Sequence, residues 1–298
     1  MTAALSKPIT GVAFGALLCA LAPATLAATP KAGDVFTDCK PDCPEMVVLP
    51  AGTFTMGTPE DEQGREEDEG PQHPVTFAKP FAVSRFQVLN GQWQAYLKDT
   101  GFQMPSGDDR PGRECIAGVP RYSETKEYKS RDAARYPAVC MNYHEAEAYA
   151  AWLSKKTGKH YRLLSEAERE YAARGGSVGP QPFPRDEGKA YSIAGHANTY
   201  GPEDGFSYIA PAGSYAPNAF GIHDAHGNVY EWTADCQNDS YVGAPDDGSA
   251  WKAGDCVVRM IRGNDWTEAP IFSRSGNRNY RNPERRGDWL GFRVVREL

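Results

Sequence analysis

Hydrophobic and polar positions follow strand and helix periods in the first two thirds of the chain. Apolar residues at 46–50 and 52–57 predict two short strands around a turn, and 74–83 predicts another strand pair. Apolar residues at helical spacing predict a helix over 89–100 that ends at Gly101. Residues up to about 100 are therefore expected to form both strands and a helix.

Two further helices are marked by capping boxes, in which a first residue and a glutamate three positions later satisfy each other's backbone amides. Asn142 with Glu145 predicts a helix to about residue 156. Ser165 with Glu168 predicts another to about residue 173.

The remaining segments predict much irregular chain. Residues 103–135 are polar and weakly periodic, which is typical of a long surface insertion. From 177 onward the chain is rich in glycine, proline and asparagine, with strands expected only at 256–262 and 291–296. No internal repeat or linker divides the chain, so we expect a single folded domain over 45–298.

The N-terminus has the three parts of a cleaved signal peptide at 1–27. Lys7 is a lone positive charge, 9–21 is mostly apolar, and 25–27 offers small residues for cleavage before Ala28. The alternative of a membrane anchor is disfavoured because the apolar run is shorter than the roughly 20 residues that span a bilayer. We therefore expect an exported, periplasmic protein without a membrane anchor, in which residues 28–44 form a lead-in segment.

Charge and cysteine content narrow the possible partners. The net charge is −7, and −8 without the signal segment, which holds one lysine and no acid. An acidic chain without a basic run argues against nucleic acid and anionic membranes as partners. Export also favours disulfides among the six remaining cysteines, for which 15 connectivities exist. Their order suggests pairing between neighbours, namely Cys39–Cys43, Cys115–Cys140 and Cys236–Cys256.

Three sequence blocks carry a more specific signal. They are 46–57 with 73–83, 136–176 including the run EAEREYAARGG, and 220–293 including GNVYEWT and GFR. In this order and spacing they resemble the formylglycine-generating-enzyme family, also called the sulfatase-modifying-factor family. The resemblance covers about 45–297 and implies an α+β fold related to C-type-lectin-like folds.

The resemblance also implies two structural calcium loops. The first would use side-chain oxygens of Asn198 and Asp204 with carbonyls of Thr199 and Phe206, and the second would use Asp224, Gly227, Val229 and Glu231. The alternative is ordinary turn and cap hydrogen bonding.

The family's copper(I)-binding cysteines are not present at the matching positions. The first position holds Glu268 and the second Ser273. Because copper(I) prefers thiolate ligands, we expect no copper and no formylglycine formation by the family mechanism.

A carboxylate at the family's reacting position suggests acid/base chemistry at Glu268. A glutamate partly buried among aromatic side chains keeps its proton to higher pH and can exchange it near neutrality. The nearby residues expected to bind substrate are Trp266, Ser273, Arg274, Arg281 and Trp289, with Phe272, Tyr280 and Arg278 as further walls or anchors. The alternative is that Glu268 pairs with an arginine and only holds its loop.

Among exported family members without the two cysteines, the chain resembles proteins of pyoverdine maturation. This implies conversion of dihydropyoverdine to pyoverdine, by oxidation or tautomerisation, on a small-molecule or siderophore-peptide substrate. Two alternatives remain: a non-catalytic, calcium-stabilised module that binds a ligand or partner, and a copper-free relative that acts on another exported substrate.

Overall fold

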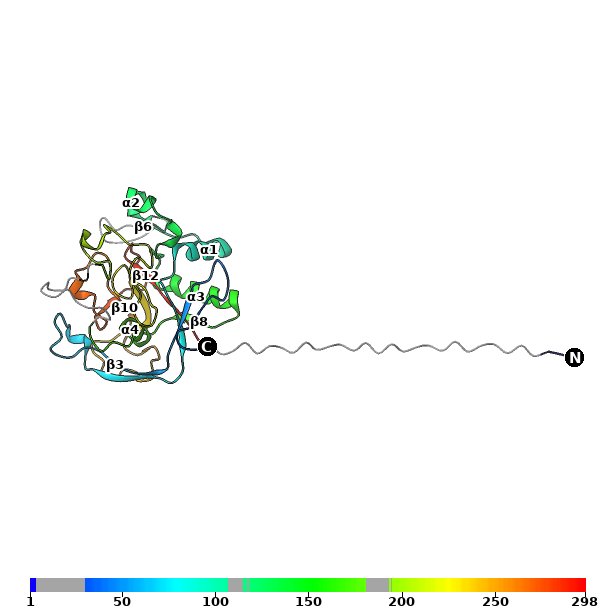
Figure 1. Cartoon of the computed structure of the whole chain (residues 1–298), viewed down its shortest axis with the longest axis horizontal. Coiled ribbons are helices and arrows are strands. Elements are labelled where there is room, and N and C mark those ends of the chain that lie inside the picture. Colours follow the sequence, from blue (N-terminus) through cyan, green and yellow to red (C-terminus); the bar gives the residue numbers. More distant parts are fainter. Residues whose placement is uncertain (4–29, 107–114, 117, 181–192, 194) are drawn as a thin grey trace.

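The computed structural model describes residues 1–3, 30–106, 115–116, 118–180, 193 and 195–298 (Figure 1). The predicted signal peptide therefore lies almost entirely outside the described residues. Within them, no helix combines the length and the apolar character needed to cross a membrane.

The first sheet has five antiparallel strands. They are, in spatial order, β1 (Val35–Phe36), β2 (Met46–Leu49), β5 (Phe81–Ser84), β13 (Val294–Arg296) and β8 (Tyr161–Leu163). The C-terminus consequently lies beside β8 (Figure 1). Val35 pairs with Val47, so the predicted lead-in segment contributes a strand and the fold begins before residue 45.

The second sheet has four strands and carries the candidate site. It contains, in spatial order, β11 (Arg278–Arg281), β10 (Asp255–Arg262), β9 (Tyr230–Gln237) and β12 (Leu290–Phe292). Only the β9–β12 pair is parallel. A separate hairpin joins β3 (Gly52–Met56) to β4 (His73–Phe77), so β2 and β3 belong to different sheets although they are neighbours in sequence.

Three longer helices match their predicted spans closely. They are α1 (Asn90–Thr100), α3 (Tyr143–Thr157) and α4 (Glu166–Arg174). Both capping boxes are present: Asn142 Oδ1 accepts the Glu145 amide at 2.9 Å, and Ser165 Oγ accepts the Glu168 amide at 3.0 Å. Gly101 ends α1 with φ of 70°, a left-handed conformation that glycine adopts without steric cost.

The segment 103–135 has more regular structure than its polarity predicts. It includes β6 (Cys115–Ile116), β7 (Val119–Pro120), α2 (Lys126–Lys129) and the 3₁₀ turns η2 (Arg121–Glu124) and η3 (Ala133–Arg135). The other 3₁₀ turns are η1 (Glu67–Glu69), η4 (Pro202–Asp204) and η5 (Pro270–Phe272). Tyr122 anchors this segment to the domain by donating its hydroxyl to the Asp288 carbonyl at 2.9 Å.

Apolar side chains from both sheets and from α1 and α3 form one core. Trp93, Tyr149 and Phe292 meet there with ring centroids 5.3–6.0 Å apart, and all three are buried. A second core packs α4 against β2 and β5. All nine residues of α4 are buried, charged ones included, so the helix depends on ion pairs with other elements.

Three disulfides connect the cysteines in neighbouring pairs. They join Cys39 to Cys43, Cys115 to Cys140, and Cys236 to Cys256. The predicted connectivity, the α+β class and the large share of irregular chain are confirmed.

Candidate functional site

Glu268 lies in the loop that joins β10 to β11. Its amide donates to the Asp265 carbonyl at 3.3 Å, and its carbonyl accepts the Tyr200 amide at 2.9 Å. Asn264 closes the loop by donating its side-chain amide to Ser273 Oγ at 2.7 Å. The main chain therefore fixes the position of Glu268 while its side chain stays half-buried.

The Glu268 carboxylate forms no hydrogen bond or ion pair with any residue that the structure describes. Among the described residues, Glu268 therefore does not pair with an arginine, which was the alternative role expected for it. A half-buried carboxylate without a protein partner is free to accept a proton from a ligand.

The phenol of Tyr230, the first residue of β9, lies near this carboxylate. Asn279 donates its side-chain amide to the Tyr230 hydroxyl oxygen at 3.3 Å. Burial raises the pKa of Tyr230, and the charges of Asp265 and Glu268 raise it further, against the opposing effect of Arg281. The phenol is therefore protonated at neutral pH and surrounded by two acids and one arginine.

Arg281 and Trp289, two of the residues predicted to bind substrate, meet beside Tyr230. The Arg281 guanidinium lies 5.3 Å from the centroid of the Trp289 ring. It donates to Asn279 Oδ1 and to the Tyr280 carbonyl, and it has no carboxylate partner among the described residues. The rings of Trp289 and Tyr230 meet edge-on with their centroids 5.9 Å apart. Trp289 is fully buried, so it supports the Arg281 guanidinium and offers no exposed surface to a substrate.

Arg274 does not line the candidate site. Its side chain is fully buried and donates to both oxygens of Glu69, at 2.6 and 2.7 Å, and to Glu62 at 2.8 Å. This prediction is wrong, because the guanidinium is already saturated inside the protein.

Trp266 and Ser273 also have partners within the protein. Trp266 is half-buried and packs edge-on against Tyr122 at 5.9 Å and against Tyr208 at 5.4 Å. Ser273 is fully buried and accepts the hydrogen bond from Asn264, so it closes the loop and does not face a ligand.

Sequence reasoning missed three residues of this cluster: Tyr230, Asp265 and Asn279. Each stands close to a residue that was singled out, since Tyr230 precedes Glu231, Asp265 is three positions before Glu268, and Asn279 is two before Arg281. The strand β9 itself was missed because its residues are buried on both faces and show no polar alternation.

The first predicted calcium loop has a donor set that fits a hard cation. Asp204 accepts the amides of Thr199 at 2.7 Å and Phe206 at 3.1 Å, which curls the loop around its carboxylate. The side-chain oxygen of the buried Asn198 has no hydrogen-bond partner among the described residues. Burial raises the pKa of Asp204, a penalty that a bound cation would offset.

The second loop does not fit calcium as a four-ligand site. Glu231 is buried and both of its oxygens are taken, by Arg169 at 2.6 Å and by Arg293 at 2.9 Å. The carbonyl of Gly227 accepts the Val229 amide at 3.0 Å. One buried oxygen of Asp224 has no partner among the residues described, and burial raises the pKa of Asp224 to about 6. Within the described residues, no group of three or more histidine, cysteine, aspartate or glutamate side chains is arranged to hold a metal.

The cysteine chemistry does not fit a copper(I) centre at the candidate site. All six cysteines after Cys19 are in disulfides, so none offers a thiolate to a metal. Glu268 and Ser273 are poor ligands for copper(I).

Comparison with known proteins agrees with this picture. The sulfatase-modifying factor enzyme 1-like domain matches residues 31–298. Inactive C-alpha-formylglycine-generating enzyme 2 of Bos taurus is 28% identical, over 84% of this chain and 87% of its own length. The formylglycine-generating enzyme of Thermomonospora curvata is 31% identical, over 64% of this chain and 71% of its own.

Solved structures agree with the family match. PvdO from Pseudomonas aeruginosa superposes with a TM-score of 0.85 and is 66% identical, over 91% of this chain and 100% of that chain. Treponema denticola variable protein 1 has the same fold at 20% identity and a TM-score of 0.67, over 89% of this chain and 99% of that chain. The chain therefore belongs to the sulfatase-modifying factor enzyme 1-like family, and within that family it is similar to PvdO.

Proposed function

We propose that this protein completes a pyoverdine-type siderophore by converting dihydropyoverdine to pyoverdine, with Glu268 as the acid/base group. The observation that carries the proposal is the 66% identity to PvdO over nearly the whole chain, because the sequence resemblance implies a part in pyoverdine maturation. The open Glu268 carboxylate at the family's reacting position supports a chemical role for it.

The proposed reaction removes two electrons and two protons from the chromophore. Glu268 accepts a proton from a ring C–H or N–H, and the electrons leave through the catechol-bearing ring system. Dioxygen is the electron acceptor in this proposal, and it takes up both electrons and both protons to give hydrogen peroxide. The chromophore ends with one more double bond than it had before.

The neighbours of Glu268 suit a catechol substrate. Arg281 has no carboxylate partner among the residues that the structure describes, so its remaining N–H groups can donate to a catechol oxygen and favour its ionised form. The Tyr230 phenol is buried and stays protonated, so it adds no negative charge beside Glu268. The Trp289 ring packs against the Arg281 guanidinium and keeps it in place.

The proposed location is the periplasm. Three disulfides suit an oxidising compartment, and the N-terminal segment reads as an export signal. We further propose that the Asn198–Phe206 loop holds a calcium ion, which would stabilise this irregular part of the chain.

The test is conversion of dihydropyoverdine by the mature protein under air, followed by the absorbance and fluorescence of the product. Glu268→Gln keeps the side-chain shape but removes the basic oxygen, and we expect kcat to fall about 10²- to 10⁴-fold. Glu60→Gln, a change at an exposed glutamate, is the matched control and should keep the wild-type rate. Unchanged turnover in a folded Glu268→Gln protein would remove the acid/base role.

Oxygen consumption separates oxidation from tautomerisation. We expect one dioxygen consumed and one hydrogen peroxide formed for each pyoverdine. The same rate without oxygen would indicate tautomerisation of an already oxidised ring. If the wild-type protein binds the substrate without converting it, the non-catalytic binding role replaces the enzymatic one.

A further inference from the structure

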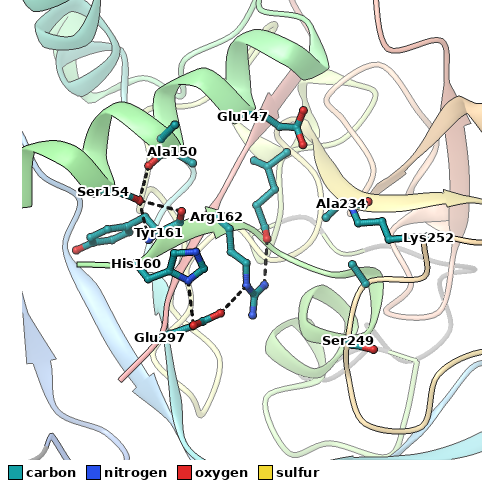
Figure 2. Close-up of a pocket in the computed structure, with 13 residues that line it drawn as sticks. Glu147, Ala150, Ser154, His160, Tyr161, Arg162, Ala234, Ser249, Lys252 and Glu297 are labelled. Carbon is teal, nitrogen blue, oxygen red and sulfur yellow. Dashed lines mark hydrogen bonds and ion pairs between the residues drawn. The ribbon is translucent and has the colours of Figure 1, made fainter. Parts of the chain in front are cut away.

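A cavity of about 640 Å³ opens between α3, β8 and the loop at 249–252 (Figure 2). Figure 2 shows Ala150 and Ser154 of α3 above it, Tyr161 and Arg162 of β8 along one side, and Lys252 on another. The volume is in the range of small-molecule sites, about 300–1,000 Å³. None of its lining residues belongs to the Glu268 cluster.

Small apolar side chains create this space. Four alanines and one leucine line the cavity, namely Ala150, Ala151, Ala234, Ala250 and Leu163. Because none of the four alanines extends beyond Cβ, the walls leave room for a flat or short apolar body.

Most polar groups of the lining are already satisfied within the protein. Ser154 Oγ donates to the Tyr161 carbonyl at 3.0 Å and accepts its amide at 2.9 Å. Arg162 pairs with Glu168 at 2.7 Å and with Glu297 at 3.1 Å, and His160 pairs with Glu297 at 2.9 Å. These groups therefore leave little charge for a ligand.

Lys252 is different, because its ammonium has no carboxylate partner among the described residues. It donates only to the Ala234 carbonyl. Glu147, which also lines the cavity, stands on α3 and accepts the Tyr143 hydroxyl at 2.7 Å. Both oxygens of the nearby, buried Asp235 accept main-chain amides, those of Glu166 and Trp251 at 2.7 Å.

A second cation, Arg259, lies next to Lys252 and has no carboxylate partner in the described part of the chain. Arg259 donates to Cys236 Sγ at 3.1 Å and lies 4.7 Å from the Tyr143 ring centroid, and its buried Nε has no hydrogen-bond partner there. Partial burial and then the charge of Arg259 lower the pKa of Lys252. Among the described residues, these two neighbouring cations form no ion pair with a carboxylate, so their positive charge can attract an anionic ligand.

We propose that this cavity binds a small molecule with one carboxylate or sulfonate group and a flat or short apolar body. The anionic group binds at Lys252 and the body lies over the four alanines. The site goes beyond the reaction at Glu268 and does not depend on it.

The test titrates the mature protein with 1-naphthoate, uncharged 1-naphthamide and cationic 1-naphthylmethylamine by calorimetry. Affinity should fall in that order. Lys252→Gln should weaken naphthoate binding about tenfold, the loss of one charge-assisted hydrogen bond, and leave naphthamide unchanged. Lys155→Gln, at an exposed lysine of α3 outside the cavity, is the matched control.

A second pair of variants tests the place of binding. Ala151→Phe puts a ring into the cavity mouth from the exposed side of α3 and should abolish binding, whereas Ala148→Phe on the same helix should not. Equal affinity for all three probes, no naphthoate binding by the wild-type protein, or unchanged binding in Lys252→Gln or Ala151→Phe would overturn the proposal. Conversion of dihydropyoverdine should be unaffected by all four substitutions, so this proposal and the Glu268 mechanism fail independently.

Discussion

Arg274 and Arg281 lie seven positions apart, and the sequence assigns both to a substrate site, yet the structure places them in opposite environments. Arg274 is fully buried and saturated by Glu62, Glu69 and the Gly64 carbonyl. Arg281 is half-buried, stacks on Trp289 and has no carboxylate partner among the described residues.

The difference separates stabilising charges from charges available to a ligand. A buried ion pair contributes little net stability, but removing one partner leaves the other charge buried and unpaired. A cation with spare N–H groups at the surface adds little to folding and can donate to an incoming oxygen. The paired or unpaired state of a charge therefore indicates its role better than its sequence position does.

The largest expected effect is on folding, from Arg274→Ala. It leaves the fully buried Glu69 without its cation, and we expect the free energy of unfolding to fall by about 3–5 kcal/mol. Urea denaturation followed by far-UV circular dichroism measures this loss. A loss below about 1 kcal/mol would mean that Arg274 does not stabilise the fold in the way that distinguishes it here from Arg281.

Calcium binding tests the same contrast between paired and unpaired groups, here for an oxygen atom. We expect its effect on stability to be intermediate in size. Asn198 Oδ1 is buried and accepts no hydrogen bond within the described part of the chain, whereas Glu231 is held by two arginines. At 100 times its dissociation constant, calcium should stabilise the protein by about 2.7 kcal/mol, seen as a higher Tm that EGTA reverses. Asp204→Asn should weaken the response, and an equal Tm with calcium and with EGTA would exclude the loop as a site.

The sequence predicts local features well and long-range partners poorly. The capping boxes of α3 and α4 and the three disulfides connect residues at most 25 positions apart, and all were predicted. The partners of Arg274 lie 205 and 212 positions away, so nothing near it indicates an ion pair. The same holds for Glu231, whose partners Arg169 and Arg293 are both 62 positions away.

Arg281→Ala should affect substrate binding and leave folding nearly intact. We expect the KM for dihydropyoverdine to rise about tenfold, the loss of one charge-assisted hydrogen bond, with kcat little changed. The free energy of unfolding should change by less than about 1 kcal/mol. Arg281→Lys, which keeps the charge but loses the planar donors, should recover part of the affinity. A large stability loss with unchanged KM would reverse the assignment of the two arginines.

The smallest expected effect is the change of stability with pH below 4.5, and it concerns the paired charges. Burial alone would raise the pKa of Glu170, but the guanidinium groups of Arg174 and Arg262 outweigh it and hold the pKa below the ordinary value of 4.5. Because the unfolded chain takes up this proton first as pH falls, the stability that Glu170 contributes is complete above about pH 4.5. It is lost as pH falls further, through the lower pKa of the folded state.

The Glu170→Gln protein should therefore be less stable than wild type at pH 7, and the difference should shrink below pH 4.5. Urea unfolding at pH 7, 5, 4 and 3.5 measures it, with Glu60→Gln as the exposed control. A difference that stays constant or grows on acidification would show that the ion pairs do not hold Glu170 ionised. Since Arg281 pairs with no acid in the described part of the chain, Arg281→Ala should leave this dependence of stability on acid pH unchanged. The pH dependence therefore separates paired from unpaired charges.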